Sequence, residues 1–204
     1  GVDRNLEKML PDAKIALLEP GLEFFKKLPK KKGLVNLRAA AGRYSNETYL
    51  FNYETPGASI FKENSKILKR YAQHVVERKE NKQNKIKIKI TSIKKILKKI
   101  SFNRIDAIKI DTQGSEIDIL KGGNEILNNC KIILLECPII SYNIGAPSLN
   151  DYIKYLDSID YLPLNITEIH HLDKVLVQVD IIFLKKDIFQ KIYTDKKMLK
   201  IFNR

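Results

Sequence analysis

Three acidic residues, Glu19, Asp111 and Glu136, each follow a short apolar run in the sequence. Such runs are typical of buried strands, and the carboxyl ends of parallel strands meet at one edge of a sheet, where ligands bind. We therefore expect the three carboxylates to share a crevice, although they lie far apart in the sequence. The alternative is that each one caps a following helix, which suits Asp111 because Gly114 and Ser115 come shortly after it.

Each carboxylate has a possible chemical task. Glu19 could accept hydrogen bonds from both hydroxyls of a ribose, which would select for a nucleoside. Asp111 stands where a strand turns into a helix, and it could face a cationic sulfonium, a metal ion or an acceptor hydroxyl. A hydroxyl acceptor needs a general base, for which Asp111, Glu116 and the pair His170 and His171 are candidates. The alternative for the two histidines is a solvated loop.

Alternating strands and helices would have to position these residues. Periodicity predicts strands over residues 15–18, 34–41, 48–52, 85–90, 105–110, 132–135, 162–169 and 175–184. Helical spacing is found over residues 6–10, 22–28, 115–120 and 149–159. This order predicts an α/β fold with a mostly parallel sheet, in which the last two strands form an antiparallel pair. Lysine and isoleucine alternate over residues 85–90, which predicts a strand with one wet face near a sheet edge.

The 204 residues are enough for a single domain. Residues 62–85 are polar and highly charged, and we interpret them as an insertion or lid. Residues 187–204 are predicted to form a basic helical tail.

The net charge of +13 invites a nucleic-acid interpretation, but of the 37 basic residues only seven are arginine. Base and phosphate recognition favours the arginine fork, so a solvated lysine surface is the better interpretation and nucleic-acid binding is not expected. The sequence contains neither a membrane-spanning apolar stretch nor a signal pattern at its N-terminus. Cys130 and Cys137 lack neighbours at zinc-ligand spacing, so we expect reduced thiols, no metal site and a cytoplasmic location.

Several blocks, in order and at suitable spacing, carry a family resemblance. They are Leu18-Glu19-Pro20, Ala40-Ala41-Gly42, Gly57-Ala58-Ser59-Ile60, Asp111-Thr112-Gln113-Gly114-Ser115-Glu116, Leu120-Lys121-Gly122-Gly123, Leu135-Glu136 and Gln178-Val179-Asp180-Ile181-Ile182-Phe183. Together they resemble the FkbM family of S-adenosylmethionine-dependent methyltransferases. The resemblance implies a Rossmann-like methyltransferase fold, S-adenosylmethionine as cofactor, and methyl transfer to an oxygen of a small molecule or sugar.

The resemblance also implies roles for single residues on the cofactor side. Glu19, with Pro20, would hold the ribose, and the small side chains of Ala40 and Ala41 would leave room for the adenine. The family's first strand and its glycine-rich Asp-x-Gly-Ala-Asn-x-Gly turn have no counterpart in this sequence, and Gly1 aligns with the end of that turn. The expected fold is accordingly a Rossmann-like one without its first strand.

On the acceptor side, the resemblance places Asp111 near the methionine part of the cofactor and the reacting methyl group. Glu116 and Glu136 would line the acceptor pocket, Asp180 would be structural, and Ser59 corresponds to a recurrent serine near the mouth of the cleft.

Our leading hypothesis is an S-adenosylmethionine-dependent O-methyltransferase acting on a hydroxyl of a carbohydrate or small metabolite. The alternative is a non-catalytic binding or scaffold domain derived from such an enzyme. A third hypothesis is RNA binding through the lysines.

Overall fold

The computed structural model describes residues 12–55, 57–71, 84–172 and 174–194. The predicted helix over residues 6–10, Gly1, residues 72–83 of the segment 62–85 and residues 195–204 of the predicted tail lie outside these ranges. The strands are β1 (Ile15–Leu18), β2 (Leu34–Leu37), β3 (Ala40–Gly42), β4 (Asn46–Phe51), β5 (Lys85–Ser92), β6 (Ala107–Ile110), β7 (Ile132–Pro138), β8 (Tyr161–Leu172) and β9 (Val175–Lys185). The helices are α2 (Leu22–Lys26), α3 (Ser65–Tyr71), α5 (Ile93–Lys99), α6 (Glu116–Gly122), α7 (Asn124–Leu127), α8 (Leu149–Ser158) and α9 (Lys186–Thr194).

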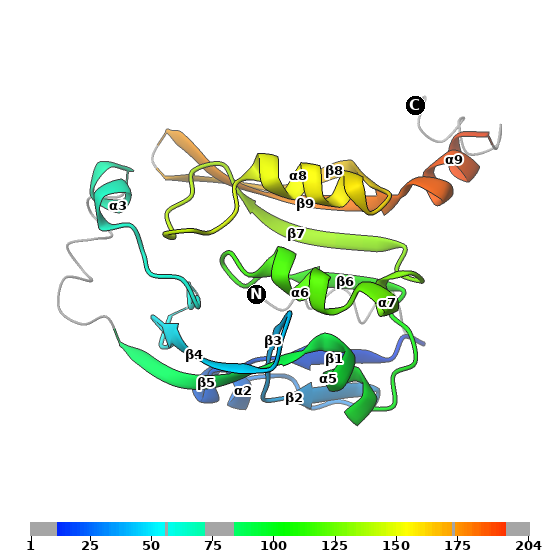
Figure 1. The fold of residues 1–204 in the computed structure, drawn as a ribbon, viewed down its shortest axis with the longest axis horizontal. Helices are drawn as coiled ribbons and strands as arrows, with labels where there is room; N and C mark the ends of the chain where they lie inside the picture. The colour runs from blue at the N-terminus through cyan, green and yellow to red at the C-terminus, as the bar shows by residue number, and fades with distance from the viewer. Residues whose placement is uncertain (1–11, 56, 72–83, 173, 195–204) are drawn as a thin grey trace.

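The described strands form three sheets, in the orders β1-β2, β3-β5-β4 and β6-β7-β9-β8 (Figure 1). Parallel pairing joins β1 to β2, β3 to β5 and β6 to β7, whereas β4, β8 and β9 pair antiparallel with their neighbours. The expectation of an α/β chain with an antiparallel C-terminal pair is confirmed. The expectation of one mostly parallel sheet is wrong for the described residues, because alternating elements do not specify which strands pair.

Two predicted strands differ in detail. Residues 34–41 form two strands in different sheets, since the chain leaves β2 at Leu37 and pairs again from Ala40 onward. The lysine–isoleucine strand lies near an edge over most of its length, since among the described residues Lys85–Lys89 pair with β4 alone. It is the middle strand β5, with β4 on one side and β3 pairing with its last residues on the other. Its lysines nevertheless remain exposed, and Lys87 forms an ion pair of 2.6 Å with Glu47 on β4.

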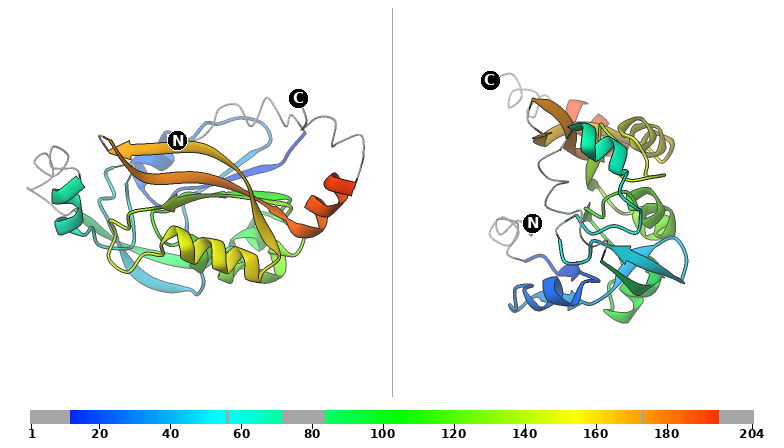
Figure 2. Two further views of the ribbon diagram at one scale, coloured as in Figure 1. Left: turned by 90° about the horizontal axis from the view of Figure 1, so that it is seen from above. Right: turned by 90° about the vertical axis from the view of Figure 1, so that its left-hand side faces the viewer.

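The main core lies between the four-stranded sheet and the helices α6 and α8. Helices α5, α6 and α8 lie along one side of the strands, and α2 lies on the other (Figure 2, right). Fully buried side chains at the centre include Ile133 and Leu135 of β7, Phe183 of β9, and Leu156 of α8. Ile133 and Leu135 occupy alternate positions of β7, as burial of one face of the sheet requires.

Helix α8 begins where the sequence predicts it. The Ser148 hydroxyl and backbone amide both donate to Asp151 Oδ2, at 2.7 and 2.8 Å, which satisfies groups at the helix N-terminus. Tyr152 and Leu156 then face the core from one side of the helix. This anchoring matters below, because Tyr152 reaches the candidate site.

Helix α6 packs closely against the backbone of strand β3. A Cβ on Gly122, the last residue of α6, would lie 2.2 Å from the carbonyl oxygen of Gly42 in β3. The pair Gly122-Gly123, which the sequence suggests as a helix stop, therefore also allows α6 to approach β3.

Strand β8 is an edge strand with three irregularities in its pairing with β9. One of them falls between Ile166 and Glu168, so that Thr167 is an extra residue opposite Asp180. The bulge sets Glu168 opposite Asp180 in the ladder. No helix of the described residues is both long enough and apolar enough to cross a membrane.

Candidate active site

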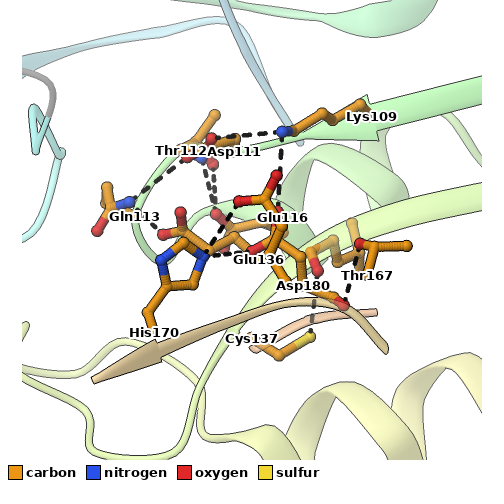
Figure 3. Close-up of polar contacts among 12 residues, drawn as sticks. Lys109, Asp111, Thr112, Gln113, Glu116, Glu136, Cys137, Thr167, His170 and Asp180 are labelled. Atoms are coloured by element: carbon orange, nitrogen blue, oxygen red, sulfur yellow. Dashed lines mark hydrogen bonds and ion pairs between the residues drawn. The ribbon is translucent and has the colours of Figure 1, made fainter. Parts of the chain in front are cut away.

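Carboxylates from neighbouring strands gather at one end of the four-stranded sheet (Figure 3). Glu136 on β7 pairs with Asp180 on β9, which in turn pairs with Glu168 on β8. Asp111 comes directly after β6, whose last residue, Ile110, pairs with Leu135. Because paired residues of adjacent strands present their side chains to the same face, this register aligns the acids in a row.

Gln113 joins two of these carboxylates. Its amide nitrogen donates a hydrogen bond to Glu136 Oε1 and lies 3.4 Å from Asp111 Oδ1. The negative charge of Asp111 also raises the pKa of the Glu136 carboxyl group. The structure therefore brings Asp111 and Glu136 together, as expected from the ends of adjacent parallel strands.

The surroundings of Glu136 favour its protonated form. Burial, followed by the negative charges of Asp111, Asp180 and Glu116, raises the pKa of Glu136 to about 8. The pKa of Asp180 is also raised by burial, although Lys109 and His170 act in the opposite direction. A carboxyl group that titrates near neutral pH can exchange a proton with a bound hydroxyl.

Glu116 has a different environment. It is completely buried at the start of α6, and its oxygens accept hydrogen bonds from the backbone amides of Thr112 and Gly114 at 2.9 to 3.2 Å. The hydroxyls of Thr112 and Tyr152 donate as well. With its lone pairs occupied by the turn before α6, Glu116 fixes the path of the chain that follows Asp111.

The turn is held from outside as well. The carbonyl oxygen of Gln113 accepts hydrogen bonds of 2.8 Å from Ser59 Oγ and from Asn143 Nδ2. Gln113 has a φ of 58°, an uncommon conformation for a residue other than glycine, so these two donors hold a strained residue in place. Ser59 thereby acquires a definite structural partner.

A small pocket opens beside Gln113 and Glu136. Tyr142 is part of the pocket wall, and its hydroxyl lies 2.5 Å from Gln113 Oε1 and 2.8 Å from Gln178 Oε1. Burial raises the pKa of Tyr142, so this hydroxyl remains a neutral donor. The lining residues are Gln113, Gly114, Glu136, Pro138, Ser141, Tyr142, Asn143 and Ala146.

The beginning of the charged segment lies against this pocket. The backbone amide of Asn64 donates to the carbonyl of Tyr142 at 2.6 Å, and that of Ile144 donates to the carbonyl of Lys62 at 2.8 Å. A β-bridge joins Glu63 to Asn143. The segment therefore contacts the loop that lines the pocket.

A lysine and a histidine border the acidic row. Lys109 Nζ lies 4.0 Å from Asp111 Oδ2 and 3.8 Å from Asp180 Oδ2. His170 Nε2 lies 3.3 Å from Asp180 Oδ1. His171, the other candidate base, is exposed on β8. Within the part of the chain that the structure describes, His170 is the one of the two histidines that contacts the acidic residues.

The residues expected on the cofactor side lie in the smaller sheets. Glu19 follows β1, and its Oε1 accepts a 2.7 Å hydrogen bond from the backbone amide of Gly21. Burial raises the pKa of Glu19, which is half-buried like Pro20. Ala40 and Ala41 pair with β5 as part of β3. The crevice predicted for three acids thus joins Asp111 and Glu136 within one sheet, while Glu19 belongs to another.

A larger groove lies elsewhere, beside α2 and β2. Four lysines line this groove, namely Lys26, Lys30, Lys31 and Lys32. Phe25, Leu34 and Asn36 complete the lining. It shares no residue with the pocket beside Glu136. Its size does not make it the better candidate site, because the carboxylates and their perturbed pKa values are found at the smaller pocket.

Sequence reasoning assigned no role to Gln113, Tyr152 or Lys109. Gln113 lies inside the Asp111–Glu116 block, which belongs to the family resemblance. The block did not indicate that the Gln113 side chain contacts two carboxylates. Tyr152 had no such signal, because an apolar-facing tyrosine on α8 is indistinguishable from an ordinary core residue until its hydroxyl is seen on Glu116.

The chain was compared with protein families, curated proteins and solved structures. A family model described as "Methyltransferase FkbM domain" matches residues 4–163. The match includes Glu19, Asp111 and Glu136 but does not extend to the Gln178–Phe183 block that contributed to the resemblance. Neither the curated proteins nor the solved structures gave a match. Since the family model covers most of the chain, the protein belongs to the FkbM methyltransferase domain family.

Proposed function

We propose that this protein transfers a methyl group from S-adenosylmethionine to a hydroxyl of a carbohydrate or small metabolite, with Glu136 as the general base. The observation that carries the proposal is the carboxyl group of Glu136 at the wall of a small pocket, where the Gln113 amide nitrogen that binds it also contacts Asp111. Family membership supports the methyl transfer itself.

Glu19 suits the expected nucleoside. Among the described residues only Gly21 donates to its carboxylate, at Oε1, which leaves Oε2 available to a ligand. The two hydroxyls of a ribose are hydrogen-bond donors. Glu19 and the adjoining Pro20 would therefore hold the ribose, while Ala40 and Ala41 remain the proposed neighbours of the adenine.

The chemistry that S-adenosylmethionine supplies when bound is an electrophilic methyl group on a sulfonium. The protein's own part is to orient the acceptor hydroxyl and to take up its proton. Glu136 is suited to the second task, because a base works best when its pKa lies near the working pH. Asp111 then helps to orient Glu136 through Gln113, whose amide nitrogen contacts both carboxylates, and we assign Glu116 to positioning the turn.

Cytoplasmic location is part of the proposal. Cys130 and Cys137 are both buried and free, which agrees with a reducing compartment.

Titration calorimetry with S-adenosylhomocysteine tests the cofactor. We expect binding by the wild-type chain and at least about tenfold weaker binding by Glu19→Gln, the scale of a charged hydrogen bond. Glu23→Gln is the matched control, since Glu23 is exposed on α2 and pairs only with lysine at 2.9 Å among its described contacts. Absence of binding by the wild-type chain at millimolar ligand would favour the scaffold alternative.

A further inference from the structure

The hairpin of β8 and β9 brings a histidine and two carboxylates together beyond the part of the chain that the family model matches. His170 Nε2 lies 3.3 Å from Asp180 Oδ1 and 3.6 Å from Glu168 Oε2. One ligand atom from each of the three residues falls within 4.8 Å of the others. The three side chains share a face because Thr167 bulges and Glu168 pairs with Asp180.

Asp180 is the unusual member of this cluster. Its side chain is only 4% exposed, and Oδ1 accepts no hydrogen bond from any described residue. Its other oxygen, Oδ2, lies 3.8 Å from Lys109 Nζ, which is a loose ion pair. Buried carboxylate oxygens normally have hydrogen-bond partners, and those without one often face an ion or water. Oδ1 points at His170, so the missing partner would lie between the two side chains.

The histidine does not supply that partner. Nε2 of His170 is buried and also makes no hydrogen bond with the described residues. Two atoms 3.3 Å apart, both lacking a hydrogen bond, are misaligned for one, because a hydrogen bond requires direction as well as distance. A cation that both atoms coordinate needs no such alignment between them.

The separations suit a shared metal ion. Imidazole nitrogens and carboxylate oxygens bind Zn²⁺ at about 2.0–2.2 Å, which places neighbouring ligand atoms roughly 3–3.6 Å apart. The distances of 3.3 and 3.6 Å from Nε2 agree with this spacing. The side chain of Glu168 is 63% exposed, so it can adjust to the ion.

The charges nearby favour a cation as well. Asp111 adds its negative charge to those of Asp180 and Glu168, and Lys109 lies near both Asp111 and Asp180. A divalent ion would offset the repulsion that these acids exert on one another.

We propose that Glu168, His170 and Asp180 bind a divalent transition-metal cation such as Mn²⁺ or Zn²⁺. A set of one imidazole and two carboxylates suits these ions better than Ca²⁺ or Mg²⁺, which prefer oxygen alone. Three protein ligands leave at least one coordination position for water or for an oxygen of a bound molecule.

The test uses the whole chain after treatment with a chelator and dialysis. Mn²⁺ is added, and the free ion is followed by electron paramagnetic resonance, while Zn²⁺ is titrated by calorimetry. We expect one ion for each wild-type chain and at least about tenfold weaker binding by His170→Ala. Glu168→Gln is expected to weaken binding similarly, and because Glu168 is exposed this variant is expected to fold.

His171→Ala is the matched control. His171 is the next residue along β8 and is exposed, and it does not belong to the cluster. Equal affinity in His170→Ala, Glu168→Gln and the wild type would place any bound metal elsewhere and overturn the proposal. So would absence of Mn²⁺ and Zn²⁺ binding by the wild-type chain. Since the readout is metal binding, it does not depend on methyl transfer.

Discussion

A Cβ atom on Gly114 would lie 2.7 Å from the Cβ of Ala146, which places the turn before α6 in direct contact with the loop that lines the pocket. The φ of Gly114 is +121°, a backbone conformation that residues other than glycine rarely adopt. Two independent constraints therefore require glycine at this position.

We expect Gly114→Ala to lower the free energy of unfolding by at least about 2 kcal/mol, because it adds a clash to backbone strain. Urea denaturation measures the loss. Gly33→Ala separates the two causes, since Gly33 has a φ of +90° but no atom within 4 Å of its Cβ position. That variant should lose only about 1–2 kcal/mol. Equal losses in both variants would show that the contact with Ala146 does not matter.

Tyr152→Phe should destabilise the protein by about 1–3 kcal/mol, because it removes a donor from the buried carboxylate of Glu116. Tyr155→Phe, on the same helix, is the control, as the Tyr155 hydroxyl donates to no described residue. It should change stability by less than about 0.5 kcal/mol. Thermal unfolding followed by circular dichroism compares the two, and similar midpoints would contradict the role given to Tyr152.

Stability should fall as the pH rises from about 5 to 8. The pKa of Glu136 is about 8 in the folded protein against 4.5 for an ordinary glutamate. The unfolded chain therefore loses this proton first, and ionisation favours unfolding throughout that window.

Glu136→Gln removes the penalty, so its melting temperature at pH 8 should exceed that of the wild type, by about 2–4 °C for each kcal/mol regained. Glu47→Gln, at an exposed ion pair with Lys87, is the control and should follow the wild-type pH dependence. A wild-type melting temperature that is flat across this range would show that Glu136 is not held protonated.

If Glu136 is the base, the rate of methyl transfer should increase with pH and level off above about 8, where its carboxylate is ionised. Glu136→Gln should reduce the rate by about 10²–10⁴-fold while leaving the affinity for S-adenosylhomocysteine unchanged. The measurement is a pH–rate profile with a saturating acceptor. A profile that stays the same in Glu136→Gln would exclude this residue as the base.

Both thiols should be inert in the folded protein. Burial raises the pKa of Cys130 to about 11 and that of Cys137 further still, so little thiolate exists at neutral pH. A disulfide reagent at pH 7.5 should therefore react with neither cysteine in buffer and with both in denaturant. Rapid labelling of the native chain would show that one of them is accessible.

Local patterns were sufficient for the elements that depend on near neighbours. Helical spacing predicted the start of α8 at Leu149, and two apolar runs separated by a short turn predicted the β8–β9 pair. Pairing between distant strands was not readable, because an isoleucine-rich strand can pair on either side. The pairing of β3 with the last three residues of β5 is an example.

The candidate site was predictable in part for the same reason. Asp111 and Glu136 end adjacent parallel strands, and this rule alone brings them together. The burial of Glu116 under Tyr152 depends on packing across 36 residues. The position of Glu168 beside Asp180 depends on one extra residue in β8, and a bulge has no reliable signature in a single sequence.

We expect the irregular pairing of β8 to limit self-association of the protein in concentrated solution. Its exposed side chains include Leu164, Ile166 and Ile169, an attractive surface for another strand. Pro163 lacks an amide donor, and the bulges interrupt the straight ladder that a second molecule would need. The distortion that assembles His170 and its neighbours thus also protects the edge of the sheet against aggregation.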